Sequence, residues 1–256
     1  MITRYEISLC PDQHCIPRLE WGYRLYSALL NEASDSFGAS VHQDTVTPLS
    51  QFLLIEEQKL TWVVNLLGSE SEKSLSGLIE GRDSFYLRKD QVNLKVTCCI
   101  KKQLMDIDEL FARTYTSNGG HLLQFQTPTA FKSRGQYRNI PTERLIMQSL
   151  INKWNGCFPE CPIEDEDGQG MEAIAAGISF RRFQLQDGTY HLKRTAIPGF
   201  TGELYIENQL SGFHRDLAEM LLAFAEYSGV GIKTALGMGG ILHQYLPERN
   251  AQRSTV

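Results

Sequence analysis

The chain has 256 residues, of which 42% are hydrophobic and 21% are charged, and its formal net charge is −5. This length and apolar content are sufficient for one or two compact units with a buried core. No apolar run approaches the length of a membrane span and the first residues lack a signal-peptide pattern, so we expect a cytoplasmic protein without a membrane partner.

Positive charge is concentrated locally, although the whole chain is acidic. Between residues 119 and 158, five basic residues accompany one acidic residue, which makes this segment net +4. A second basic group consists of Arg181, Arg182, Lys193 and Arg194. A chosen face can therefore attract a polyanion while the remaining surface limits non-specific binding.

The cysteines predict neither disulfides nor a bound metal. The six are Cys10, Cys15, Cys98, Cys99, Cys157 and Cys161, and none forms a Cys-x-x-Cys pair. In a cytoplasmic chain we expect free thiols. A zinc site that joins Cys10, Cys15, Cys157 and Cys161 is the alternative, although its spacing is irregular. We predict no metal and no cofactor.

The first half of the chain predicts a β-α-β-β-α-β order. Alternation or helical periodicity predicts, in turn, a strand at 2–9, a helix at 21–37, strands at 49–56 and 60–67, a helix at 71–79 and a strand at 91–100. This is the order of a ferredoxin-like fold.

The same order restarts after the natural break at residues 117–120. We predict a strand at 121–127 and a helix at 142–154 with Thr142 as its N-cap. Strands at 173–185 and 190–205 follow, joined by a turn at 186–189. The unit ends with a strand at 240–246, preceded by a helix whose apolar stripe is Phe213, Leu217, Met220, Leu221 and Phe224. The fold class is therefore α+β, with tandem ferredoxin-like (RRM-like) halves at residues 1–118 and 119–256.

Five glycines fall within residues 229–240, between the striped helix and the last strand. This order excludes a dinucleotide fingerprint, and Ile232 before Lys233 excludes a P-loop. Glycines allow backbone N–H groups to converge on a phosphate, so we predict phosphate contacts from the loop. The predicted contacts are Gly229, Gly231, Lys233, Thr234, Gly237 and Gly239. Tight packing of a helix on a sheet is the alternative role of the glycines.

This loop, with two further segments, resembles the CRISPR-associated endoribonucleases that cut repeat RNA. The other segments are residues 123–132 (LQFQTPTAFK) and 198–204 (PGFTGEL), and all three lie in the order of that family. The resemblance implies cutting of CRISPR repeat RNA to release guide RNAs. Other subunits of a CRISPR effector complex are further candidate partners, and the choice between monomer and homodimer stays open.

RNA carries its own nucleophile, because a 2′-hydroxyl can attack the neighbouring phosphate without a metal. The reaction leaves a 2′,3′-cyclic phosphate and a 5′-hydroxyl, and it needs a positioned acid and base. His42, in a polar loop after the first helix, occupies the place of the family's catalytic histidine, and Tyr26 occupies that of its helical tyrosine. The family's lysine shortly after the histidine is missing from residues 43–50. Lys233 can replace it, His42 can act with little help, or cleavage is slow or absent.

Two basic groups are further candidates for RNA contacts. Arg181, Arg182, Lys193 and Arg194 flank the turn predicted at 186–189, so adjacent strands could present them together to phosphates. Lys132 and Arg134 follow the strand at 121–127 in a basic loop.

Two other functions compete with the endoribonuclease. An RNA-binding subunit of a CRISPR effector complex would keep the glycine loop without needing His42, and the missing lysine favours it. A small-molecule enzyme or regulator on a ferredoxin-like fold would show no salt-sensitive affinity for RNA.

Overall fold

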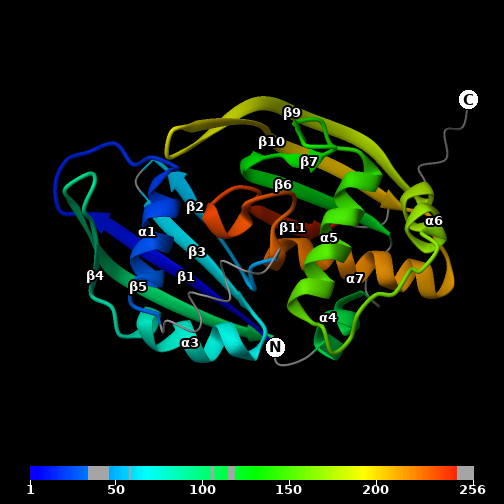
Figure 1. The fold of residues 1–256 in the computed structure, drawn as a ribbon, viewed down its shortest axis with the longest axis horizontal. Coiled ribbons are helices and arrows are strands. Elements are labelled where there is room, and N and C mark those ends of the chain that lie inside the picture. The colour runs from blue at the N-terminus through cyan, green and yellow to red at the C-terminus, as the bar shows by residue number, and fades with distance from the viewer. Residues whose placement is uncertain (34–45, 58, 105–106, 115–118, 247–256) are drawn as a thin grey trace, which may run out of the picture.

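Two antiparallel sheets with matching strand order form the framework of the protein (Figure 1). The structure is a computed structural model, and it describes residues 1–33, 46–57, 59–104, 107–114 and 119–246. The elements of the first sheet and its helices are β1 (Ile2–Pro11), α1 (Trp21–Leu30), β2 (Leu49–Glu56), β3 (Lys59–Leu67), α3 (Ser69–Glu80), β4 (Ser84–Leu87) and β5 (Val92–Leu104), and α4 (Ile107–Thr114) follows.

The second sheet is built from the remainder of the chain. Its elements are β6 (Gly120–Thr129), a small hairpin of β7 (Phe131–Ser133) and β8 (Gln136–Arg138), α5 (Glu143–Cys157), α6 (Gln169–Gly177), β9 (Ile178–Leu192), β10 (Thr195–Asn208), α7 (Gly212–Ser228), the 3-10 turn η1 (Thr234–Leu236) and β11 (Ile241–Tyr245). Among these described helices, none combines the length and the apolar character that a membrane crossing needs.

The strand order confirms the tandem ferredoxin-like prediction. The sheets run β2-β3-β1-β5-β4 and β11-β6-β10-β9, so each contains the order fourth-first-third-second of the β-α-β-β-α-β unit. The short strand β4 extends the first sheet at its edge and was not predicted from the sequence pattern. The boundary predicted at residue 118 lies outside the described residues and stays a prediction.

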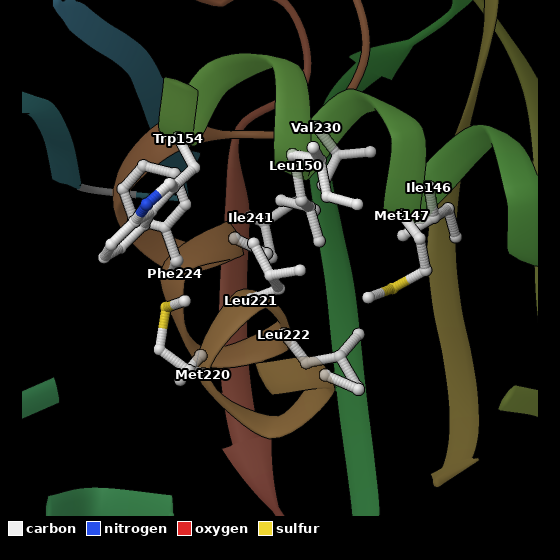
Figure 2. Close-up of a cluster of buried hydrophobic side chains, with 14 of the residues drawn as sticks. Ile146, Met147, Leu150, Trp154, Met220, Leu221, Leu222, Phe224, Val230 and Ile241 are labelled. Carbon is white, nitrogen blue, oxygen red and sulfur yellow. The ribbon is translucent and has the colours of Figure 1, made fainter. Parts of the chain in front are cut away.

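The strand that begins each unit lies inside its sheet because its side chains are buried. Tyr5, Ile7 and Leu9 alternate into the first core, and β1 pairs with both β3 and β5. In the second half, α5 and α7 pack on β6 and β11 (Figure 2). Trp154 and Phe224 meet edge to face with ring centroids 5.2 Å apart, a geometry that adds stability beyond the buried area.

The helix boundaries follow from local chemistry. Thr142 caps α5 as predicted, because its Oγ1 accepts a hydrogen bond from the Leu145 backbone N–H at 3.2 Å. Along α7, the predicted apolar stripe is buried at Leu217, Met220, Leu221 and Phe224. Its first predicted member, Phe213, is 74% exposed, so that part of the prediction is wrong. Phe213 lies in the first turn of α7, before the helix reaches the core.

The turn predicted at residues 186–189 is wrong. Strand β9 continues through this segment to Leu192, and Gly188 pairs with Gly199 of β10 inside the ladder. The turn lies instead at Lys193 and Arg194, where Lys193 adopts a left-handed φ of 56°. The strand predicted from residue 173 is also partly wrong, because residues 173–177 belong to α6. Strands β9 and β10 thus form one long two-stranded ribbon, the β9–β10 ribbon (Figure 1).

A buried polar cluster joins β6, α7 and β11. His121 Nδ1 lies 2.9 Å from His243 Nε2, and His121 Nε2 lies 3.0 Å from a carboxylate oxygen of Glu219. Asn208 donates to the other Glu219 oxygen at 2.7 Å. Burial and the neighbouring His121 lower the pKa of His243 to about 3, while Glu219 acts in the opposite direction. His243 is therefore neutral in the folded protein at neutral pH.

We expect this cluster to make the protein sensitive to acid. A depressed folded pKa means that the unfolded chain binds the extra proton first, so stability present above pH 6.5 is lost as the pH falls toward 3, at up to about 1.4 kcal/mol per pH unit. His243→Gln removes that proton site. Urea unfolding at pH 7.5 and pH 5 should show a smaller loss of stability for His243→Gln than for the parent protein. Equal losses would show that His243 is not responsible.

Candidate nucleic-acid interface

The glycine loop, residues 229–240, lies between the two sheets, where η1 contacts both α1 and β2 (Figure 1). Its glycine N–H groups donate to other groups of the protein rather than facing outward. The acceptors are Ala225 O for Gly229, Ser149 Oγ for Gly231, Thr234 O for Gly237, Pro128 O for Gly239 and Thr127 Oγ1 for Gly240. The prediction that these N–H groups surround a phosphate is therefore corrected.

The glycines instead allow the backbone to pack closely, which is the alternative that the sequence left open. At Gly231, φ is +81° and an added Cβ would lie 2.3 Å from the carbonyl oxygen of Ala130. At Gly239, φ is +64° and an added Cβ would lie 2.0 Å from the carbonyl oxygen of Val230. No side chain fits at such distances from main-chain atoms.

The tip of the glycine loop, residues 231–236, is fixed by both halves of the protein. From the N-terminal half, Gln51 Nε2 donates to the Ala235 carbonyl at 3.1 Å, and Trp62 Nε1 holds Gln51 in place with a bond of 2.8 Å. From the β9–β10 ribbon, the Tyr190 hydroxyl donates to the Leu236 carbonyl at 2.6 Å. The tip is therefore rigidly positioned, as a binding site on a scaffold requires.

A cleft of about 930 Å³ opens at this loop tip, between the two halves. Its walls come from α1, α5, β7, the turn of the β9–β10 ribbon and the tip itself. Four lysines line it: Lys132, Lys153, Lys193 and Lys233. No carboxylate occurs among the described residues that line the cleft. Four lysines, with no carboxylate among the described residues around them, make this cleft suitable for a polyanion.

Lys153 was missed as a site residue, because the sequence showed it only as one of five basic residues in a segment. It lies on α5, half-buried, one turn after Ser149. Its ammonium donates to Thr234 Oγ1 at 2.6 Å, while Ser149 Oγ accepts from the Gly231 N–H at 2.8 Å. No local signal marked these contacts, because Thr234 lies 81 positions from Lys153 and Gly231 lies 82 from Ser149.

Tyr26 lies where the prediction requires it, on α1 and at the wall of the cleft. Burial, with a smaller contribution from Tyr23, raises the pKa of Tyr26 to about 12. Its hydroxyl therefore stays protonated at neutral pH, where it can donate a hydrogen bond but cannot serve as a base.

His42 lies outside the described residues, but the chain on both sides of its segment borders the cleft. Asn31 and Val46 both line the cleft. Val46 packs against α5 so closely that a Cβ added to Gly156 would lie 2.5 Å from the Val46 Cβ. Gly156 is one turn of α5 beyond Lys153.

The four basic residues assigned to one hairpin turn are not brought together. Lys193, at the turn of the β9–β10 ribbon, reaches the cleft, and its ammonium lies 5.6 Å from the ring centroid of Tyr23. Arg181 and Arg182 lie eleven or more residues back along β9, about 35 Å away at the usual rise of a strand. Arg181 pairs with Glu207, and Arg182 stacks over Tyr205 at 5.2 Å.

The remaining basic candidates also separate. Lys132 lines the cleft, whereas Arg134 lies at the turn of the β7–β8 hairpin with a φ of 49°. Arg194 lines a second groove of about 770 Å³ together with His191 and several other basic residues: Arg18, Arg24, Arg82, Arg88 and Lys89. This groove shares Tyr23, Ser27, Asn31 and Lys193 with the cleft, so the two form one continuous surface.

These positions predict unequal contributions to binding of a polyanion. Lys193→Met should make RNA affinity less dependent on salt. If the variant loses one phosphate contact to a single strand, the slope of log K against log salt should become shallower by about 0.7. Arg181→Gln should leave the slope unchanged, because Glu207 already balances that charge. Fluorescence anisotropy at several salt concentrations measures both slopes, and equal losses would mean that RNA follows the whole ribbon.

No cysteine is paired in the structure. Among the residues that the structure describes, no group of three His, Cys, Asp or Glu side chains is placed to hold a metal ion. The zinc alternative is therefore not supported for Cys10, Cys15, Cys157 and Cys161.

The fold and the cleft define a class: tandem ferredoxin-like proteins with a C-terminal glycine loop wedged between the halves. The family model for CRISPR-associated endoribonuclease Cas6 matches residues 123–241. A protein of that name from Streptococcus thermophilus is 28% identical over 237 residues, which cover 88% of this chain and 92% of the relative. One from Mycobacterium tuberculosis strain CDC 1551 / Oshkosh is 29% identical over 234 residues, with 89% and 73% coverage.

Solved structures show the same fold. A Cas6 product complex superposes with a TM-score of 0.77 at 20% identity and covers 95% of this chain and 100% of its own. Cas6 of Thermus thermophilus superposes with a TM-score of 0.71 at 21% identity and coverage of 95% and 98%. The chain is thus a homologue of the Cas6 proteins, and the family resemblance found in the sequence is confirmed.

Proposed function

We propose that this protein is an endoribonuclease that cuts CRISPR repeat RNA to release guide RNAs. The observation that carries the proposal is the lysine-lined cleft at the tip of the glycine loop, in a chain whose relatives are named endoribonucleases. Structural neighbours of the same fold include Cas6 product and substrate-mimic complexes. Repeat RNA is therefore the proposed partner.

The proposed reaction uses the 2′-hydroxyl of the RNA as the nucleophile. The bond from the 2′-oxygen to phosphorus forms and the bond from phosphorus to the 5′-oxygen breaks, which leaves a 2′,3′-cyclic phosphate and a 5′-hydroxyl. His42 exchanges the protons as general acid or base, since an imidazole suits both roles near neutral pH. Tyr26, protonated and at the cleft wall, donates a hydrogen bond to the reacting group. The step requires no metal.

The RNA backbone runs through the cleft and along the connected groove in this proposal. The cations that face it are Lys132, Lys153, Lys193 and Lys233 in the cleft, with Arg194 in the groove. The Thr234 hydroxyl accepts from Lys153 and retains its own proton to donate. Gly229, Gly231, Gly237 and Gly239 act by shaping the loop tip.

Incubation of the wild-type protein with the repeat RNA of its own genome, in excess chelator, tests the proposal. We expect cleavage at one position, with product ends that phosphatase treatment and mass measurement identify as cyclic phosphate and 5′-hydroxyl. Tight, salt-sensitive binding without cleavage would instead assign the protein as an RNA-binding subunit. The absence of both binding and cleavage would refute the proposed function.

A further inference from the structure

The four lysines of the cleft differ in how they are held. Lys132 and Lys193 are exposed, and Lys233 lies at the loop tip. Lys153 is half-buried and fixed at its tip by the bond of 2.6 Å from Nζ to Thr234 Oγ1. Thr234 is itself 6% exposed and begins η1, which Gln51 and Tyr190 anchor at the next two carbonyls. The ammonium is therefore preorganised rather than free to swing.

The charge of Lys153 is not balanced by the groups that the structure places around it. The described lining of the cleft contains no carboxylate. The nearest titratable group on α5 is Cys157, one turn further, and burial raises the pKa of that thiol to about 12, so it stays neutral. Burying a cation without an anionic partner is unfavourable, and an entering phosphate would remove that penalty.

The environment also makes the charge of Lys153 sensitive to pH. Burial lowers the pKa of Lys153 to about 8, while Cys157 acts in the opposite direction. Such shifts in a cleft are typical of functional groups. Lys153 is charged below about pH 8 and loses its charge above it.

We propose that Lys153 is a catalytic residue that binds the phosphate undergoing cleavage, and that Thr234 is the positioning residue that aims its ammonium. The inference rests on the proposed function. As the 2′-oxygen bonds to phosphorus and the 5′-oxygen departs, negative charge grows on the non-bridging phosphate oxygens. The Lys153 ammonium stabilises that charge and keeps its own proton. One proton leaves the 2′-oxygen and one is added to the 5′-oxygen, so the step is balanced.

This assignment accounts for a departure seen in the sequence. Residues 43–50 carry no lysine after His42, although a cation is needed where charge develops. The cation comes from α5 instead, about 100 positions further along the chain. Lys153 replaces the missing group more directly than Lys233, whose side chain no described hydrogen bond fixes.

The test is the single-turnover cleavage rate of repeat RNA by Lys153→Met. We expect a loss of about 10²-fold, the usual effect of removing one transition-state donor, with RNA affinity changed much less. Lys73→Met, at an exposed position of α3, is the matched control and should cut at the wild-type rate. Lys153→Met cutting as fast as wild type would overturn the inference.

Two further variants separate catalysis from a structural role. The wild-type rate should fall as the pH rises through about 8, and Lys73→Met, which keeps Lys153, should show the same fall. Lys153→Arg should lose that fall, because its charge persists, and it should recover part of the rate. Thr234→Val should lower the rate by several-fold and lower the affinity much less. An unchanged pH profile in Lys153→Arg would contradict the assignment.

A labelling experiment on the wild-type protein covers the case in which Lys153→Met fails to fold. Amine acetylation, followed by mass spectrometry, reports the accessibility of each lysine with and without RNA. Bound RNA should protect Lys153 strongly and Lys73 not at all. RNA that binds and is cut without protecting Lys153 would overturn this inference and leave the proposed function intact. RNA that is neither bound nor cut would refute the proposed function instead.

Discussion

His42→Ala should lower the single-turnover rate of repeat cleavage by about 10²–10⁴-fold, the usual contribution of a positioned acid or base. The described residues before His42 end at Ala33, and those after it begin at Val46. Both Asn31 and Val46 line the cleft. His42 is four positions before Val46 in the chain, a span of at most about 14 Å. This chain distance is compatible with the catalytic role proposed for His42.

RNA affinity should change little in His42→Ala, because the lysines of the cleft supply the phosphate contacts in this proposal. His14→Ala is the matched control, since His14 is an exposed loop histidine outside the lining of the cleft. Full cutting by His42→Ala in chelator would refute the catalytic role of His42. An equal loss in His14→Ala would show that the rate responds to unrelated surface changes.

Gly239→Ala should destabilise the protein by more than about 3 kcal/mol, at the upper end of single substitutions. An alanine at φ +64° is strained, and its Cβ would lie 2.0 Å from the Val230 carbonyl oxygen. The loop would have to move to remove this strain and this close contact. Such a movement would weaken the bonds from the Gly239 N–H to Pro128 O (3.2 Å) and from the Val230 N–H to Gly239 O (3.0 Å).

Gly77→Ala is the matched control for this substitution. Gly77 lies inside α3, and an added Cβ would meet nothing within 4 Å. Alanine there should stabilise the protein by about 1 kcal/mol through helix propensity. Urea unfolding of both variants measures the difference. A Gly239→Ala protein as stable as wild type would mean that the glycine loop does not join the two halves as described.

The element order could be predicted because most elements carry their signal locally. The strand predicted at 49–56 matches β2, and Thr142 caps α5 as its residue type indicates. The prediction of a turn at 186–189 was wrong because distant strand pairing, and not the local sequence, decides the conformation there. Asp187-Gly188 favours a turn locally, but strand pairing along the β9–β10 ribbon keeps the segment extended and moves the turn to Lys193 and Arg194. Tertiary pairing of this kind leaves no local trace.

The candidate site was predictable only where residues come from the resembled motifs. Tyr26, Lys132 and the loop-tip residues do line one cleft. Lys153 could not be selected, because its partner Thr234 lies 81 positions away and only folding places α5 against the loop. Arg181 and Arg182 were grouped with Lys193 through the misplaced turn. The glycines were assigned the wrong physical role, since main-chain donors in a tight loop can bond internally.

Crosslinking with photoreactive repeat RNA tests the central claim most directly. The claim is that the ribonucleotide backbone occupies the cleft between the two halves, at the tip of the glycine loop. RNA that carries 4-thiouridine at successive positions should crosslink to peptides of α1 near Tyr23, of α5 near Lys153 and of the loop tip near Lys233. Crosslinks confined to α3 or to the ribbon around Arg181 and Arg182, with none at those three places, would contradict the claim.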